Sequence, residues 1–160
     1  MNQEMAIRRA GLDDLDLVAP LFDAYRQFYR QSEDLEGARS FMRDRLENRD
    51  SVVFLAFCSA GAETAPAGFT QLYPSLSSVS MKPIWILNDL FVAQEFRGRG
   101  VGRWLMRAAR DFAAEDGAAR ITLATERGNH RAKALYEAES YILDEVFDHY
   151  NLPLNNLPLT

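Results

Sequence analysis

The sequence predicts an α/β fold, in the α+β sense, built on one mixed sheet of six to seven strands with helices on both faces. Short β-rich apolar runs alternate with stretches at helical spacing along most of the chain. Residues 84–112 have the pattern of a strand, a glycine loop and a helix. Another strand-like run at 120–125 follows that helix, so these strands should lie parallel through a right-handed crossover. The earlier runs follow one another closely, so the first half of the sheet should be antiparallel.

Length and composition limit the classes of protein that fit. The chain has 160 residues, which suits one domain spanning 1–160. The net charge of −5 argues against a nucleic-acid partner. No apolar run reaches the roughly 18 residues of a membrane span, and the N-terminus lacks a signal-peptide pattern, so we expect a cytoplasmic protein that binds no membrane. Cys58 is the single cysteine, so we expect no disulfide and no metal site.

The first half of the chain should begin with a strand at 5–10. A helix should follow from Leu12, with Leu15, Val18, Phe22, Tyr25 and Tyr29 on one face and Pro20 inside it. A polar loop at 31–37 then leads to a second helix over 38–48. Residues 51–59 form an apolar strand, 61–68 a turn rich in small residues, and 68–73 the returning strand of a hairpin. The serine-rich residues 74–83 should be a mobile connection.

The second half starts with the strand at 84–92, whose apolar run is interrupted only by Asn88 and Asp89. Its helix should end at Asp116 and Gly117. After the strand at 120–125, a last helix should open at Gly128 and Asn129. Residues 141–154 offer two more short strands, and 155–160 should be a loose tail.

The glycine loop at 97–102 is a candidate phosphate site, because a helix that starts on glycines leaves its first N–H groups accessible. A Walker A loop would need Lys and then Ser or Thr after its last glycine, where this chain has Arg103 and Trp104. A dinucleotide fingerprint would need a glycine at Arg103 and an N-terminal strand. Neither class fits.

The spacing of Arg97, Gly100 and Gly102 after a strand ending in LFV resembles the (Q/R)xxGx(G/A) loop of the GNAT family of N-acetyltransferases. Residues 129–137, NHRAKALYE, resemble the second family motif, with Asn129 at the start of a helix and Tyr136 seven residues later. The order of elements also matches along nearly the whole chain. Ser140 departs from the family, which usually has Gly after this helix. Both motifs occur in the expected order, which makes the resemblance specific.

The resemblance implies a single GNAT-like domain that binds acetyl-coenzyme A where the central parallel strands splay apart. Backbone groups of Phe91 and Val92 would pair with the pantetheine arm. Glycine at 100 and 102 would let phosphate oxygens reach the backbone amides. Arg97, Arg99 or Arg103 could add charge-assisted bonds, and Asn129 could face the cofactor besides capping its helix. The residues implied to bind the cofactor are Phe91, Val92, Arg97, Gly98, Arg99, Gly100, Val101, Gly102, Arg103 and Asn129.

For catalysis, the resemblance implies that Tyr136 donates its phenolic proton to the departing thiolate; the alternative is an ordinary core aromatic. Some relatives that acetylate polyamines carry a Glu where this chain has Asn88, which cannot act as a base. The base is therefore open between Asp89, Glu126 and a chain of water molecules, and Asp89 could instead be a structural carboxylate. His130 and His149 fit surface positions, since no Ser or Cys is spaced to partner them.

The acceptor side should come from the first two helices and residues 74–83. Tyr29, Tyr73 and Asn88 are the predicted substrate contacts; Tyr25, Glu33 and Asp34 are further candidates for an aromatic, acidic pocket. The chain is therefore identified as an acyltransferase that moves an acetyl group to a primary amine of a small molecule by direct attack. A protein or peptide amine, or a non-catalytic acyl-coenzyme A sensor, are the alternatives. Members of the family are often dimers, so the resemblance also allows a homodimer.

Overall fold

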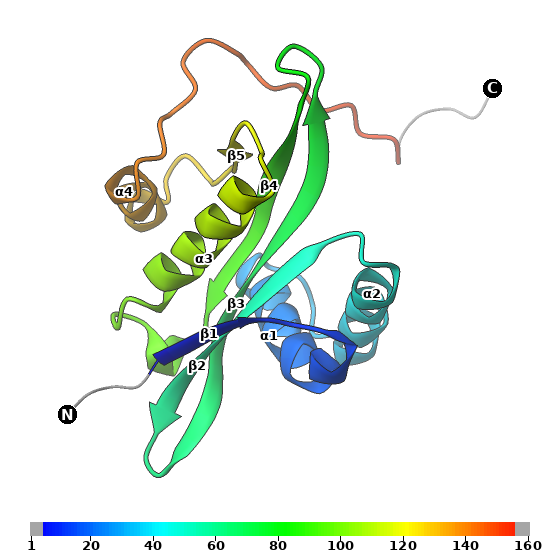
Figure 1. The fold of residues 1–160 in the computed structure, drawn as a ribbon. Helices are drawn as coiled ribbons and strands as arrows, with labels where there is room; N and C mark the ends of the chain where they lie inside the picture. The colour runs from blue at the N-terminus through cyan, green and yellow to red at the C-terminus, as the bar shows by residue number, and fades with distance from the viewer. Residues whose placement is uncertain (1–4, 156–160) are drawn as a thin grey trace.

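The computed structural model describes residues 5–155, and its sheet runs in the order β1-β2-β3-β4-β5 (Figure 1). The strands are β1 (Met5–Arg9), β2 (Val52–Ala60), β3 (Glu63–Ser77), β4 (Lys82–Val92) and β5 (Ile121–Thr122). The helices are α1 (Leu15–Phe28), α2 (Leu35–Asn48), α3 (Val101–Glu115) and α4 (His130–Ala138), with short 3-10 helices η1 (Leu12–Asp14) and η2 (Gln94–Phe96). β1 to β4 pair antiparallel and β4 pairs with β5 in parallel, which confirms the predicted mixed sheet.

Five strands are present in the described residues, fewer than the six to seven predicted. The strands expected within 141–154 are absent from the described structure, where this segment is irregular. The carboxylate of Asp144 accepts the amides of Val146 and Phe147 at 2.9 and 3.1 Å. Those donors are then unavailable to a ladder, which is how a short polar side chain competes with strand pairing. The end of the tail, 156–160, lies outside the described residues.

The turn predicted at 61–68 is limited to Gly61 and Ala62, because β3 starts at Glu63 and pairs there with β2. The mobile connection predicted at 74–83 is wrong, because the β3–β4 ladder continues to the pair Ser77 and Lys82. Both prolines of β3 lie where a strand tolerates them. Pro66 sits beside a register shift in the β2 ladder, and Pro74 lies beyond that ladder's last pair at Leu72. Small residues and serines therefore suggested more turn than the structure has.

Helices cover both faces of the sheet, as predicted (Figure 1). α1 and α2 pack on one face through a cluster that includes Val18, Met42, Phe69 and Phe91. α3 packs on the other face, where Met106 and Ala109 join Trp85 and Leu87. α2 begins earlier than expected, since the side chain of Asp34 accepts the amide of Gly37 at 2.9 Å and so caps the helix.

A β-bulge in the middle of β4 changes which face its side chains point to. Gln71 is opposite Asp89, whereas the next β3 residue, Leu72, is opposite Leu87, so Asn88 is the extra residue. Before the bulge, Leu87 lies in the cluster with α3; after it, Phe91 lies in the cluster with α1. Strand side chains alternate between faces, so an unbulged strand would keep both on one side. The single inserted residue therefore turns Asp89 toward α1 and α2.

β4 and β5 separate soon after they meet. Only Trp85 and Ile86 pair with β5 in the described structure, through Ile121 and Thr122. The remainder of β4 has no partner on this edge among the described strands, while β3 stays paired with β4 as far as Val92. The strands are therefore splayed, as predicted. Among the described residues, no helix is long and apolar enough to cross a membrane.

Candidate functional site

The glycine loop between β4 and α3 presents backbone amides at a helix start. Gly98 and Gly100 adopt φ values of 76° and 82°, in the left-handed region that favours glycine. Gly100 is the N-cap of α3, and Trp104 donates the first helical hydrogen bond, to the Gly100 carbonyl at 3.2 Å. The amides of 101–103 precede that bond, so they point out of the helix end. Together with the positive end of the helix dipole, they can bind an anion.

Gly102 lies where the start of α3, the end of β4 and α4 meet. A Cβ added there would meet the Leu135 side chain at 3.4 Å and Val92 at 3.8 Å. Both are ordinary contact distances, so packing within the chain does not by itself require glycine at this position.

The arginines of the loop are held in three different places. Arg97 donates from Nε to the Val92 carbonyl at 2.9 Å, with its guanidinium 5.6 Å from the centre of the Phe91 ring. Arg99 lies over the Phe96 ring at 5.3 Å. Arg103 pairs with Glu139 at 3.0 Å, and Arg107 pairs with the same carboxylate. Arg103 therefore joins α3 to the end of α4 through its ion pair with Glu139. The backbone amides of the loop are then the donors that remain most available to an anion.

Phe91 and Val92 lie on the part of β4 that has separated from β5. Phe91 is 9% exposed and packs on the α1 face, and Val92 packs with the cluster under α3. The Val92 carbonyl accepts from Arg97, so one backbone acceptor at this edge already has a partner. The rest of the β4 edge after Ile86 is open to an extended ligand, because an unpaired strand edge accepts an added strand.

Asp89 is buried in a network of side-chain hydrogen bonds. Its carboxylate accepts from Gln71 Nε2 at 2.6 Å and from Asn88 Nδ2 at 3.0 Å. Gln71 in turn accepts from Ser51 Oγ at 2.8 Å. Burial raises the pKa of Asp89, and hydrogen bonds from Gln71, Asn88 and Tyr25 oppose that rise. The network fixes the carboxylate in place while burial moves its pKa toward the range useful for a base.

Tyrosines surround Asp89 and link it to α4. The Tyr25 hydroxyl donates to the Asn88 carbonyl at 3.3 Å, and its ring lies 5.0 Å from that of Tyr29. Burial raises the pKa of Tyr29, and the charges of Glu126 and Asp89 add to this rise. Burial also raises the pKa of Tyr136, with a contribution from Tyr29. The charges of Asp89 and Glu126 therefore act on Tyr29, and the raised pKa of Tyr136 keeps its hydroxyl protonated at neutral pH.

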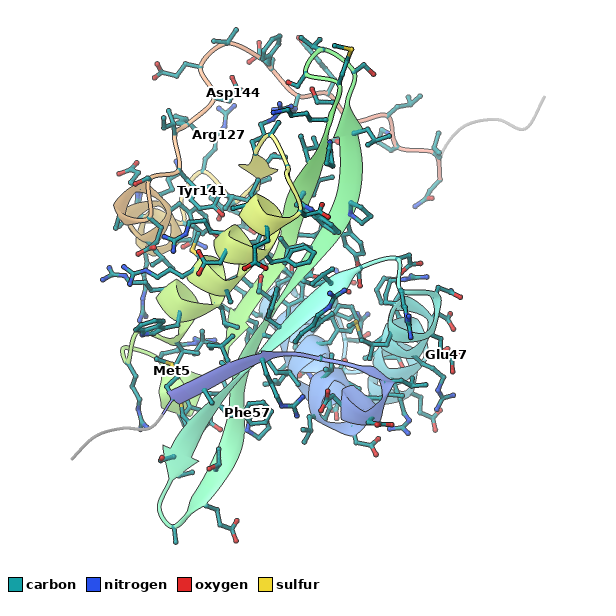
Figure 2. All side chains as sticks on the ribbon, in the orientation of Figure 1. Met5, Glu47, Phe57, Arg127, Tyr141 and Asp144 are labelled. Carbon is teal, nitrogen blue, oxygen red and sulfur yellow. The ribbon has the colours of Figure 1, made fainter. Side chains whose placement is uncertain are left out.

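Residues near the ends of α4 have structural contacts. Asn129 caps α4, since its side chain accepts the amide of Ala132 at 3.2 Å. Ser140 adopts a φ of 69°, which explains why glycine suits this turn. Tyr141 follows that turn and lies with its ring 6.1 Å from the ring of Tyr136 (Figure 2). His149 is exposed and lies 4.0 Å from Asp144, away from this group.

A cavity of about 470 Å³ lies next to Asp89, between α1, α2 and the middle of the β3–β4 hairpin. Tyr73 and Asn88, two of the three residues proposed as substrate contacts, line it, and so do Tyr25 and Asp34; Tyr29 and Glu33 are not among its lining residues. Sequence reasoning did not single out Phe22, Arg26, Phe41 or Gln71 for this site. Phe22 and Arg26 share a helical face with Tyr25, which was the available signal.

In the described chain, no group of three or more His, Cys, Asp or Glu side chains is placed to hold a metal ion.

Comparison with known proteins places this geometry among acetyltransferases. The family model described as "Acetyltransferase (GNAT) family" matches residues 18–140. An uncharacterized N-acetyltransferase, YhfO, of Bacillus subtilis is 50% identical over 148 residues, covering 92% of this chain and 97% of that protein. A crystal structure of a probable acetyltransferase has a TM-score of 0.88 at 41% identity, covering 95% of this chain and 99% of the other.

A crystal structure of an aminoglycoside N-acetyltransferase in complex with CoA has a TM-score of 0.76 at 18% identity. It covers 95% of this chain and 97% of that chain. At this level of identity the similarity concerns the fold alone.

Proposed function

Because this chain belongs to the GNAT family of acetyltransferases, we propose that it transfers an acetyl group from acetyl-coenzyme A to a primary amine of a small molecule by direct attack. The family uses acetyl-coenzyme A, and the loop and strand described above fit that group. The observation that carries the small-molecule acceptor is the cavity of about 470 Å³ that ends at Asp89. Small-molecule sites usually have volumes of this order.

The residues present can hold the parts of acetyl-coenzyme A. Amides from Gly98 to Gly102, at the positive end of α3, would receive the pyrophosphate. Phe91 and Val92 on the open β4 edge would receive the pantetheine arm. Among the described residues, Arg97 has a backbone acceptor and Arg103 an ion pair, whereas Arg99 has only a ring contact with Phe96, so Arg99 would be the one to turn toward a phosphate. Asn129 would keep its role as the cap of α4.

The reaction requires two proton transfers, one from the amine to a base and one from an acid to the departing thiolate. An amine is mostly protonated at neutral pH and must lose a proton before it attacks the thioester. Asp89, at the end of the cavity, would accept that proton directly or through water, with Glu126 as the alternative acceptor. Tyr136 would donate a hydrogen bond or its proton to the sulfur as the thiolate leaves. Acceleration from holding the two reactants together can reach about 7 to 11 kcal/mol in favourable cases.

Two other functions make different demands on the site. A protein or peptide acceptor would need an open groove, and the space between α1, α2 and the β3–β4 hairpin is open rather than enclosed, so this acceptor stays the alternative. A non-catalytic acyl-coenzyme A sensor is favoured by the way Gln71 and Asn88 occupy the Asp89 carboxylate. Binding without turnover would identify the sensor.

The test combines binding with turnover. Calorimetry should detect acetyl-coenzyme A at micromolar to millimolar concentrations, and thiol release should rise above background with members of a panel of primary amines. Replacing Tyr136 by Phe should lower kcat by about 10²-fold or more, the usual minimum contribution of a general acid. Tyr141→Phe is the matched control, because Tyr141 packs beside Tyr136 and its buried hydroxyl makes no hydrogen bond in the described structure. Absence of acetyl-coenzyme A binding at millimolar concentration would overturn the proposal.

A further inference from the structure

We propose that the acceptor carries a carboxylate as well as its amine, so that it belongs to the chemical class of amino acids; this inference rests on the proposed function. The cavity beside Asp89 has one cationic side chain among its lining residues, Arg26. Its acidic lining residues are Asp34 and Asp89. A ligand that matches both signs is a zwitterion.

Arg26 has hydrogen-bonding capacity left for a ligand. Its Nη1 donates to Asp23 Oδ1 at 3.2 Å and to the Ser32 carbonyl at 3.3 Å. A guanidinium carries five N–H donors in a planar fork, and the described contacts use only Nη1. The side chain is 28% exposed, so it is anchored but still reachable from the cavity. The remaining fork suits a carboxylate, which accepts two parallel hydrogen bonds.

Asp23, the carboxylate that pairs with Arg26, accepts hydrogen bonds from several other donors. Asp23 is 4% exposed, and its carboxylate also accepts from Gln27 Nε2 and from the Asp34 amide, both at 3.0 Å. A purely cationic ligand that filled the cavity would remove water from Arg26 and leave most of its donors without partners. Such desolvation of a charged group is costly unless the ligand supplies an acceptor.

The charges of the lining residues give the ligand's groups a definite order. Arg26 follows Tyr25 on α1, and the Tyr25 hydroxyl reaches the bulge that carries Asp89. The ligand's amine would lie toward Asp89 and the acetyl donor, and its carboxylate toward Arg26. Rings of Phe22, Tyr25, Phe41 and Tyr73 line the space between. The ligand's middle part is therefore expected to be apolar or aromatic.

The experiment compares acceptors that differ only by a carboxylate. Suitable pairs are phenylalanine with phenethylamine and lysine with cadaverine, each amino acid as both enantiomers. The native enzyme should acetylate at least one amino acid with a kcat/KM about tenfold or more above that of its decarboxylated partner. Arg26→Gln should raise the KM of that amino acid about tenfold and leave the KM of the partner amine unchanged. Comparing variant with native enzyme on the same acceptor removes any difference in the amine's own reactivity.

Arg39→Gln is the matched control, because Arg39, on α2, also pairs with an α1 carboxylate, that of Asp16, but does not line the cavity. It should keep the native preference. Equal or better use of the decarboxylated amines by the native enzyme would overturn the inference. An equal effect of Arg26→Gln on both members of a pair would do the same, since it would reveal a purely structural role. If acetyl-coenzyme A binds and only decarboxylated amines are acetylated, the proposed function stands without this inference; if acetyl-coenzyme A does not bind, both fail.

Discussion

Asp89 is the residue whose replacement should separate stability from activity. Burial raises its pKa, so the folded state binds this proton more tightly than the unfolded chain does. The associated stability is present below the unfolded pKa and is lost as the pH rises through the folded pKa. Asp89→Asn removes the buried charge but also replaces one acceptor oxygen by an NH2 group that cannot accept from Gln71 or Asn88. The two effects oppose each other, so we expect a melting temperature at pH 7 close to that of the native protein. Its kcat should nevertheless fall about 10²- to 10⁴-fold, the range of a lost general base.

The pH dependence of kcat/KM gives the companion measurement. In the native enzyme the rate should fall on the acidic side as Asp89 takes up its proton, at a higher pH than for an exposed carboxylate. Asp89→Asn should lose that acidic limb. Asp34→Asn is the control, because Asn caps a helix about as well as Asp and the limb should remain. An acidic limb that persists in Asp89→Asn would assign the base elsewhere, with Glu126 the next candidate.

At the level of single residues, sequence reasoning found Asp89 but could not show where it points. The polar pair Asn88–Asp89 inside an apolar run was the visible signal of a disturbed strand. Which residue bulges is decided by pairing with Gln71 and Leu72, which lie far away in sequence. Arg103 illustrates the same limit, since its partner Glu139 comes from another helix. Long-range partners of this kind leave no local pattern.

At the level of elements, Gly68 sets how closely β3 approaches the end of β4. A Cβ at Gly68 would lie 2.5 Å from the Phe91 carbonyl oxygen and 3.2 Å from the Val92 Cα. These are backbone atoms that cannot rotate away, so Gly68→Ala must push the strands apart. We expect the free energy of unfolding to fall by about 1–3 kcal/mol, as for other overpacked sites. Acetyl-coenzyme A should also bind more weakly, because the displaced residues include Phe91 and Val92.

Chemical denaturation and calorimetry would measure both effects. Gly11→Ala is the matched control: an added Cβ there meets nothing within 4 Å, and Gly11 has an extended φ of −119°. Its stability should change by no more than about 0.5 kcal/mol. If Gly68→Ala kept native stability and native affinity for acetyl-coenzyme A, glycine would not be needed for the close contact between β3 and the end of β4.

Elements with strong periodicity were predictable, and elements defined by their partners were not. The apolar periodicity of α1 predicted that helix and most of the face that it buries, although Tyr29 just after it is exposed. The β3–β4 hairpin was underestimated because the small residues of 61–68 and the serines of 74–83 are typical of turns, although most of these residues pair with β2 or β4. β5 was predicted over 120–125, yet the ladder with β4 covers only Ile121 and Thr122. That early separation is what opens the candidate cofactor site.

At the level of the whole molecule, the segment after α4 exposes apolar side chains that a folded chain normally covers. Their exposed fractions run from 69% to 92%, for Ile142, Leu143, Val146, Phe147, Tyr150, Leu152 and Leu154. The segment leaves α4 as irregular chain at the end of the sheet where the β3–β4 hairpin turns (Figure 1). β5 is the last strand of the sheet, and its outer edge has no partner among the described residues. Exposed apolar patches of this kind mark association surfaces.

We therefore expect a homodimer in which 142–154 of each copy is covered by the other. Burying each large apolar side chain contributes about 1.5–3 kcal/mol, so a few suffice to offset the entropy lost on association. Sedimentation and light scattering should give a dimer for the native chain. The double variant Val146→Asp with Phe147→Asp should give a folded monomer, because two carboxylates would be buried in the interface. Leu12→Asp, an exposed apolar residue of η1 outside this segment, should stay dimeric; a native chain that is monomeric at high micromolar concentration would contradict the assembly.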